Sequence, residues 1–164
     1  MLGSLCRDQC MIRIQRVAFA IGLVLNGLAW WANAAEPATG PPGASTARVV
    51  QFHGYARAIE LTRSNARVVL CPEVGGRVLE FSIDGKDAMF LEDAEKAWQP
   101  GKPARSSAGR FDYGPELTVL PHRTLWSGEW LGEITGPYSA RLTSPKDEAA
   151  GIQLVREFEL ASSG

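Results

Sequence analysis

The pattern of apolar and polar residues from Val68 to Leu91 predicts consecutive antiparallel strands. Two apolar runs flank a break rich in proline and glycine, and the pair Asp84-Gly85 then leads into a third run. An Asp-Gly pair between such runs is typical of a tight hairpin, because both residues tolerate the backbone angles that the turn needs. Leu79, Phe81 and Ile83 recur at period two, so we expect them to share one face of a sheet and to pack against a partner sheet.

The flanking segments extend this meander. The run Arg67 to Cys71 carries apolar residues on both faces, as a central strand requires. Near the C-terminus two alternating segments are separated by the polar turn Ser144 to Gly151, which predicts a hairpin. The chain is therefore expected to be all-β and to form an antiparallel β-sandwich. The expected strands are 48–52, 56–62, 67–71, 77–83, 88–91, 138–143 and 152–160, with one helical segment at 92–98 that Pro100 ends.

The first 34 residues have the pattern of a secretory signal. Arg7, Arg13 and Arg16 precede the apolar run Val17 to Leu28, and Ala32-Asn33-Ala34 is a small-residue cleavage site. The apolar run is shorter than the roughly 20 residues that a spanning helix needs. We therefore expect a signal-peptide helix (1–34) that is cleaved on export to the periplasm or outside the cell, with no stable membrane insertion afterwards. A flexible linker (35–47) rich in Pro, Gly, Ser and Thr and one β domain (48–164) are expected to follow it.

Charge and side-chain chemistry exclude several classes of function. Removal of the signal takes away three arginines and one aspartate, so the net charge changes from −1 to −3. Nucleic acids and anionic membranes need clustered positive charge, so neither is an expected partner. Cys71 is then the one remaining thiol and is interpreted as a small buried hydrophobic residue. His53 and His122 are the two histidines of the sequence, and without a Cys/His cluster, a Gly-rich phosphate loop or a G-x-S-x-G elbow we expect no metal and no cofactor.

The polar and aromatic residues that remain suit a neutral polyol. The segment from Gln99 to Pro121 is rich in glycine and proline, and Gly109 to Glu116 is its candidate functional part. Carboxylates and arginine hydrogen-bond hydroxyls, while an indole offers a flat apolar surface to a sugar ring. Each residue also has a structural interpretation: the tryptophans as core, the charged residues as an ion pair that braces the loop, and the histidine as a satisfied structural residue. The candidate binding residues are Arg110, Asp112, Glu116, His122, Trp126 and Trp130.

Short motifs occur in a recognisable order along the chain. They are Pro72-x-x-Gly75-Gly76-Arg77-Val78, Ile83-Asp84-Gly85-Lys86, Gly109-Arg110-Phe111-Asp112-x-Gly114-Pro115-Glu116, Trp126-x-Gly128-x-Trp130, Leu142-Thr143-Ser144 and Gly151-Ile152-Gln153-Leu154. In this order they resemble the galactose mutarotase-like superfamily, in particular uncharacterised exported members related to aldose 1-epimerases. The resemblance covers roughly Ile59 to Leu160, and the run from Gly109 to Glu116 is its most distinctive part.

The resemblance implies a large antiparallel β-supersandwich with a sugar-binding cleft on one sheet. Arg110 lies in a Gly-Arg context similar to that of the sugar-binding arginine of aldose 1-epimerases, and His122 is a looser match to their first histidine. The catalytic acid histidine and base glutamate of that family have no counterpart in this sequence, which matches the N-terminal portion of the fold. The resemblance thus implies a carbohydrate-binding, mutarotase-like exported protein with an incomplete domain and without the full catalytic machinery.

Two alternatives stay open at this point. One is a non-catalytic exported β-sandwich that binds a glycan or a protein partner through the aromatic-rich face around Trp126 to Trp130. The other is a glycosidase that uses Asp112 and Glu116, since two carboxylates about 5 to 9.5 Å apart can perform that chemistry. The sequence does not supply this distance.

Overall fold

The described residues fold into two antiparallel sheets and two short helices. The computed structural model describes residues 46–104, 107, 109–111, 114 and 122–161. Asp112 and Glu116, together with the predicted signal and nearly all of the predicted linker, lie outside these described residues. The elements are β1 (Thr46–Phe52), β2 (Tyr55–Arg63), β3 (Ala66–Cys71), β4 (Arg77–Ile83), β5 (Lys86–Asp87), α1 (Asp93–Lys96), α2 (Arg123–Ser127), β6 (Leu131–Gly136), β7 (Ser139–Thr143) and β8 (Val155–Glu159).

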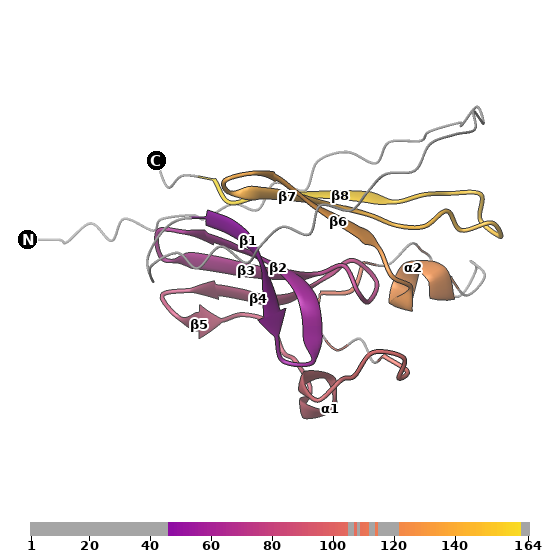
Figure 1. The fold of residues 1–164 in the computed structure, drawn as a ribbon, viewed down its shortest axis with the longest axis horizontal. Coiled ribbons are helices and arrows are strands. Elements are labelled where there is room, and N and C mark those ends of the chain that lie inside the picture. The colour runs from indigo at the N-terminus through magenta and orange to yellow at the C-terminus, as the bar shows by residue number, and fades with distance from the viewer. Residues whose placement is uncertain (1–45, 105–106, 108, 112–113, 115–121, 162–164) are drawn as a thin grey trace, which may run out of the picture.

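The first sheet has the order β1-β2-β3-β4-β5, and the second has the order β6-β7-β8 (Figure 1). All of the strand pairs are antiparallel. The prediction of an all-β chain with antiparallel sheets is therefore confirmed, as is the hairpin of β7 and β8. The predicted strand at 88–91 is wrong, because the partner of β4 is the two-residue strand β5. Strand β6 and helix α2 were not predicted from the sequence.

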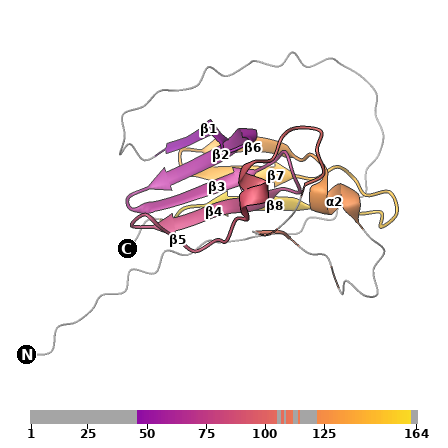
Figure 2. The ribbon, with the colours of Figure 1, turned by 90° about the horizontal axis from the view of Figure 1, so that it is seen from below.

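The two sheets contribute to one hydrophobic cluster. Leu61 of β2 and Leu70 of β3 belong to the same buried cluster as Leu142 of β7 and Phe158 of β8. Figure 2, which views the molecule from below, shows the five-stranded sheet lying across the three-stranded one. Side chains from strands that are far apart in sequence thus form the main core.

Strand β3 is buried on both faces, as its apolar pattern predicted. Val68 and Leu70 point toward the second sheet, while Val69 and Cys71 belong to a second cluster that also contains Leu91 and Tyr55. Helix α1 and the segment after it lie on this second side (Figure 2). Strand β3 is buried because it is the central strand in the order β1-β2-β3-β4-β5. A central strand has a neighbour on each side in the sheet and can be covered by other layers on both faces.

A β-bulge in β4 overturns part of the predicted facing pattern. Val69 of β3 pairs with Glu80, whereas the next residue of β3 pairs with Val78, so Leu79 is an extra residue without a partner in the ladder. Leu79 therefore packs in the cluster on the α1 side, while Phe81 packs against the core between the sheets. The prediction that these two residues share a face is wrong, because a bulge places two successive side chains on the same side of a strand.

The turn between β4 and β5 is the hairpin that the Asp-Gly pair predicts. Asp84 and Gly85 have φ values of 52° and 73°. Positive φ at both central residues is the geometry of a type I′ turn, which joins two strands with the right-handed twist of a sheet. A β-branched residue at either position would strain this turn.

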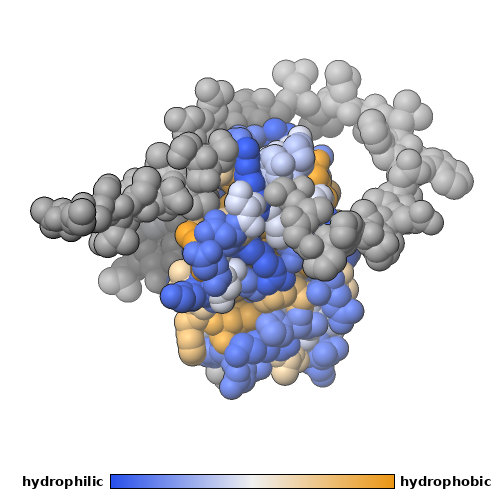
Figure 3. All heavy atoms as spheres, turned by 90° about the vertical axis from the view of Figure 1, so that its left-hand side faces the viewer, coloured by the Kyte–Doolittle hydropathy of each residue, from blue (hydrophilic) through white to orange (hydrophobic). Residues whose placement is uncertain are grey.

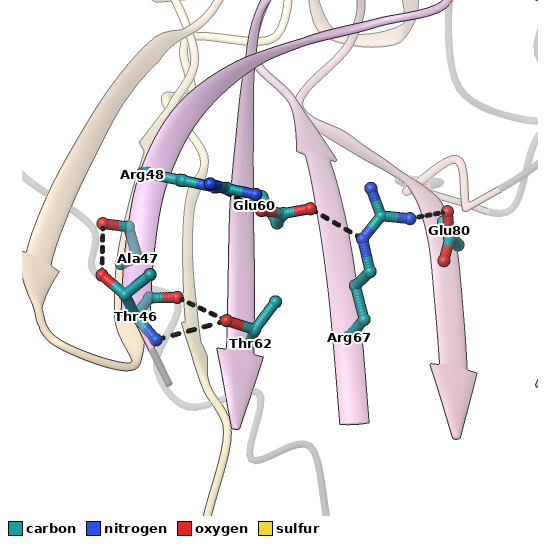
Figure 4. A network of polar contacts seen from close by, with 7 residues as sticks. All are labelled: Thr46, Ala47, Arg48, Glu60, Thr62, Arg67 and Glu80. Carbon is teal, nitrogen blue, oxygen red and sulfur yellow. Dashed lines mark hydrogen bonds and ion pairs between the residues drawn. The ribbon is translucent and has the colours of Figure 1, made fainter. Parts of the chain in front are cut away.

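The outer face of the first sheet also carries a row of charged residues. Arg48, Glu60, Arg67 and Glu80 form a chain of ion pairs across four adjacent strands (Figure 4). Burial alone would raise the pKa of Glu60. Hydrogen bonds from Arg67 and Arg48 outweigh this effect, so the pKa of Glu60 is lowered. Figure 3, a view of the left-hand side of Figure 1, shows mainly hydrophilic residues with an apolar strip between them. Within the described part of the chain, no helix is long and apolar enough to cross a membrane.

Candidate functional site

Three of the predicted binding residues lie together in the structure. The guanidinium carbon of Arg110 lies 5.2 Å from the centroid of the Trp126 ring, and the His122 ring meets the same indole edge-on at 5.9 Å between centroids. Helix α2 brings Trp126 to this place, since the amides of Leu125 and Trp126 both donate to the carbonyl oxygen of His122, 2.9 Å away. Arg110 reaches it from the loop that passes over β4, where Val78 N–H donates to the Gly109 carbonyl.

His122 and Trp126 differ in how much surface they offer. His122 is buried, and its Nδ1 atom lies 3.9 Å from the Asp147 carboxylate. Trp126 and Arg110 are both half-buried, so part of each reaches solvent. The indole N–H of Trp126 is buried and has no acceptor among the described residues. A ligand that reaches this cluster therefore contacts Arg110 and Trp126, whereas His122 is buried.

Trp130 is a core residue. It is buried in the cluster between the sheets, and its indole N–H donates to the Leu125 carbonyl at 3.2 Å. Its ring lies against Gly76, where a Cβ atom would come within 2.3 Å of the ring. Gly76 also has a φ of 54°, so this position needs glycine both for its backbone conformation and for the close approach. This arrangement matches the structural interpretation of Trp130 and explains part of the Gly75-Gly76 motif.

Arg156 supports the Arg110 loop from below and was missed from the sequence. Its Nη1 donates to the carbonyl oxygens of Gly76 at 2.6 Å and Gly109 at 3.4 Å. Its guanidinium also lies 5.4 Å from the Phe111 ring and 4.9 Å from the Phe158 ring. Burial lowers the pKa of Arg156 to about 10. The sequence feature that could have identified Arg156 is its position in β8, where it occupies an inward-facing position between the apolar residues Leu154 and Phe158.

A second buried cluster lies under α1. Arg77 donates to Glu95 at 2.6 Å and to the Tyr55 hydroxyl at 2.7 Å, and the other Glu95 oxygen accepts from the amide and hydroxyl of Ser107. Trp98 stacks on Tyr55 with 4.9 Å between ring centroids. Burial is the main cause that raises the pKa of Tyr55 to about 12. Because the carboxylate is buried and its oxygens are bonded within the fold, this cluster fixes α1 against the sheet and offers no open binding position.

Two open hollows adjoin an exposed ion pair. Arg57 Nη2 lies 2.6 Å from Glu129 Oε1, and both residues line a hollow of about 420 Å³ and another of about 460 Å³. The first hollow also has Val49, Ile59, Pro72, Trp130, Leu131 and Gly132 in its lining, and the second has Glu73, Val74, Trp98, Ser127 and residues 100–104. Sequence reasoning missed Arg57 and Glu129, although Glu129 lies inside the Trp126-x-Gly128-x-Trp130 motif.

The described residues contain no group of three His, Cys, Asp or Glu side chains that could hold a metal ion. Comparison of the chain with models of protein families, with characterised proteins and with solved structures finds no match.

Proposed function

We propose that this protein is an exported, carbohydrate-binding β-sandwich of the galactose mutarotase-like type, and that it binds sugar at Arg110 and Trp126. The observation that carries the proposal is the contact between the Arg110 guanidinium and the half-buried Trp126 indole. A sugar has apolar C–H faces and hydroxyl groups, and this pair offers an aromatic surface beside charged N–H donors.

The architecture supports this proposal in two ways. The shared hydrophobic cluster of the two sheets is what a sandwich requires. This cluster contains Leu125, the neighbour of Trp126, and Phe111, the neighbour of Arg110, packs against it. Arg156 hydrogen-bonds the Gly109 carbonyl, directly before Arg110, and so limits the movement of the loop that carries the binding arginine. A binding side chain on a braced loop loses less conformational freedom when ligand arrives.

Catalysis is not part of the proposal. Interconversion of anomers needs an acid at the ring oxygen and a base at the anomeric hydroxyl, both within hydrogen-bond reach of one sugar. His122 is the histidine of the cluster, and it is buried beside Asp147. We therefore propose binding as the activity of this chain.

The test is a glycan array, followed by calorimetric titration of the best sugar. Removal of a hydrogen bond to a charged group costs about 1.5–3 kcal/mol, so Arg110→Ala should weaken binding roughly 10- to 100-fold. Trp126→Ala should weaken it as well, whereas Arg123→Ala, at an exposed arginine of the same helix, should not. Equal affinity of the parent and Arg110→Ala proteins would refute this site, and absence of any bound glycan would refute the function.

A further inference from the structure

The edge strands β1 and β6 lie on the same side of the molecule. Strand β1 ends the five-stranded sheet and β6 ends the three-stranded sheet, and neither has an outer neighbour among the described strands. They lie close together (Figure 2), and the hollow of about 420 Å³ between them is lined by Val49 of β1 and by Leu131 and Gly132 of β6. We call this hollow with its two edges the seam.

The seam is open and carries exposed apolar side chains, although the Arg57–Glu129 ion pair also lines its hollow. Val49 pairs with Ile59, and Ile134 pairs with Ala140, and both of these partners belong to the core between the sheets. Val49 and Ile134 therefore point into the space between the sheets, yet they are 46% and 42% exposed. Inward-pointing side chains of a sandwich are normally covered. An unpaired edge beside exposed apolar side chains is a template for another strand.

Charge along β6 limits what kind of strand fits. On the outward face of the three-stranded sheet, Glu133 of β6 lies opposite Arg141 of β7, and Arg141 pairs with Glu157 of β8 at 2.9 Å. Together with Glu159, this face carries three glutamates and one arginine. The exposed Glu133 lies at the edge itself. A strand added beside β6 would thus have the acidic Glu133 on its outward side and the exposed apolar Ile134 on its inward side.

We propose that β6 binds an extended segment of a partner protein as an additional antiparallel strand, with alternating apolar and basic side chains. Apolar side chains enter the seam beside Ile134, and basic side chains lie beside Glu133. Strand addition supplies affinity through main-chain hydrogen bonds, and alternate side chains supply specificity. A second copy of this chain fits less well, since pairing of β6 with itself places acidic edges together. This inference goes beyond sugar binding and does not depend on it.

The experiment measures fluorescence anisotropy of labelled peptides of about seven residues, an ordinary strand length, with the full chain. The probe alternates valine and lysine. One control peptide has the same composition in an order that breaks the alternation, and another has glutamate in place of lysine. The alternating lysine peptide should bind at least about tenfold more tightly than either control, and its affinity should fall as salt rises. Equal binding of the three peptides, or no binding, would overturn the proposal.

Matched variants locate the binding. Glu133→Lys and Ile134→Asn should each weaken binding of the alternating peptide about fivefold or more, because one reverses the edge charge and the other removes the apolar contact. The controls Glu148→Lys and Phe90→Asn change an exposed glutamate and an exposed phenylalanine outside the two edges and should leave the affinity unchanged. Unchanged denaturation midpoints establish that the variants fold. Equal effects of edge and control variants would overturn the proposal, as would a dimer in sedimentation that Ile134→Asn dissolves.

Discussion

Two of the arginine–glutamate pairs with equal nitrogen–oxygen distances differ most in how far they are exposed to solvent. Arg77–Glu95 and Arg57–Glu129 each have 2.6 Å between nitrogen and oxygen. The side chains of the first pair are 0% and 1% exposed, whereas those of the second are 60% and 62% exposed. We predict that Arg77→Met lowers the free energy of unfolding far more than Arg57→Met does.

The magnitude follows from what each substitution leaves behind. Arg77→Met leaves the Glu95 carboxylate buried with only its Ser107 partners, and loss of one partner of a buried pair costs about 3–5 kcal/mol. The Tyr55 hydroxyl loses its contact with the guanidinium as well. Arg57→Met leaves Glu129 in water, where an ion pair contributes about 0–1 kcal/mol. The double variant Arg77→Met/Glu95→Leu should recover much of the loss, because no buried charge is then left without a partner.

Urea denaturation followed by far-ultraviolet circular dichroism measures these differences. The slope of the free energy against urea should stay the same between the variants, which establishes that the folded states expose similar surface. Equal losses below about 1 kcal/mol for Arg77→Met and Arg57→Met would show that burial does not decide the value of these pairs. A double variant that is less stable than both single variants would refute the argument from the buried charge.

Four further predictions follow from the fold and the sequence. Leu142→Ala, in the core between the sheets, should lower the free energy of unfolding by about 2–5 kcal/mol, and a loss below about 0.5 kcal/mol would contradict its burial. Burial is the main cause that raises the pKa of the Cys71 thiol from 9.0 to about 12, so the unfolded chain ionises first and stability is lost as pH rises between these values. The stability difference between the parent and Cys71→Ala should then change in favour of the variant by up to about 1.4 kcal/mol per pH unit, and a constant difference would argue against a protonated buried thiol. Mass spectrometry of exported protein should find a new N-terminus at or close to Ala35, and an intact Met1 in a membrane fraction would contradict signal cleavage. Polarimetry of a freshly dissolved α-anomer should show no acceleration by the chain, and an acceleration that Arg110→Ala abolishes would place the catalytic groups here.

Local patterns in the sequence predicted much of the fold. Strands β2, β3 and β4 follow from apolar periodicity, and the Asp84-Gly85 turn follows from the backbone angles that these residues tolerate. The hairpin of β7 and β8 follows in the same way from two alternating segments around a polar turn. Each of these features depends on neighbours a few residues apart, so the sequence states them directly.

Only the tertiary structure decided features that depend on pairing between distant residues. The bulge at Leu79 is a mismatch of register between β3 and β4, and no periodicity within β4 alone reveals the extra residue. Helix α2 and strand β6 are short, and their surroundings rather than their local composition select them. Trp130 was predicted as a binding residue from the chemistry of its indole, whereas in the structure its ring packs against Gly76 in the core.

Some features of the candidate site were likewise predicted from the sequence, and others were decided by the tertiary structure. The sequence nominated Arg110, His122 and Trp126 from their chemistry, and the fold brought them together at 5.2 and 5.9 Å. The supporting Arg156 is 46 residues from Arg110 in the chain and meets its loop through β8, a contact that sequence spacing does not encode. Residue types determine which interactions are possible, whereas the packing of the sheets determines which side chains are buried, which are paired and which reach solvent.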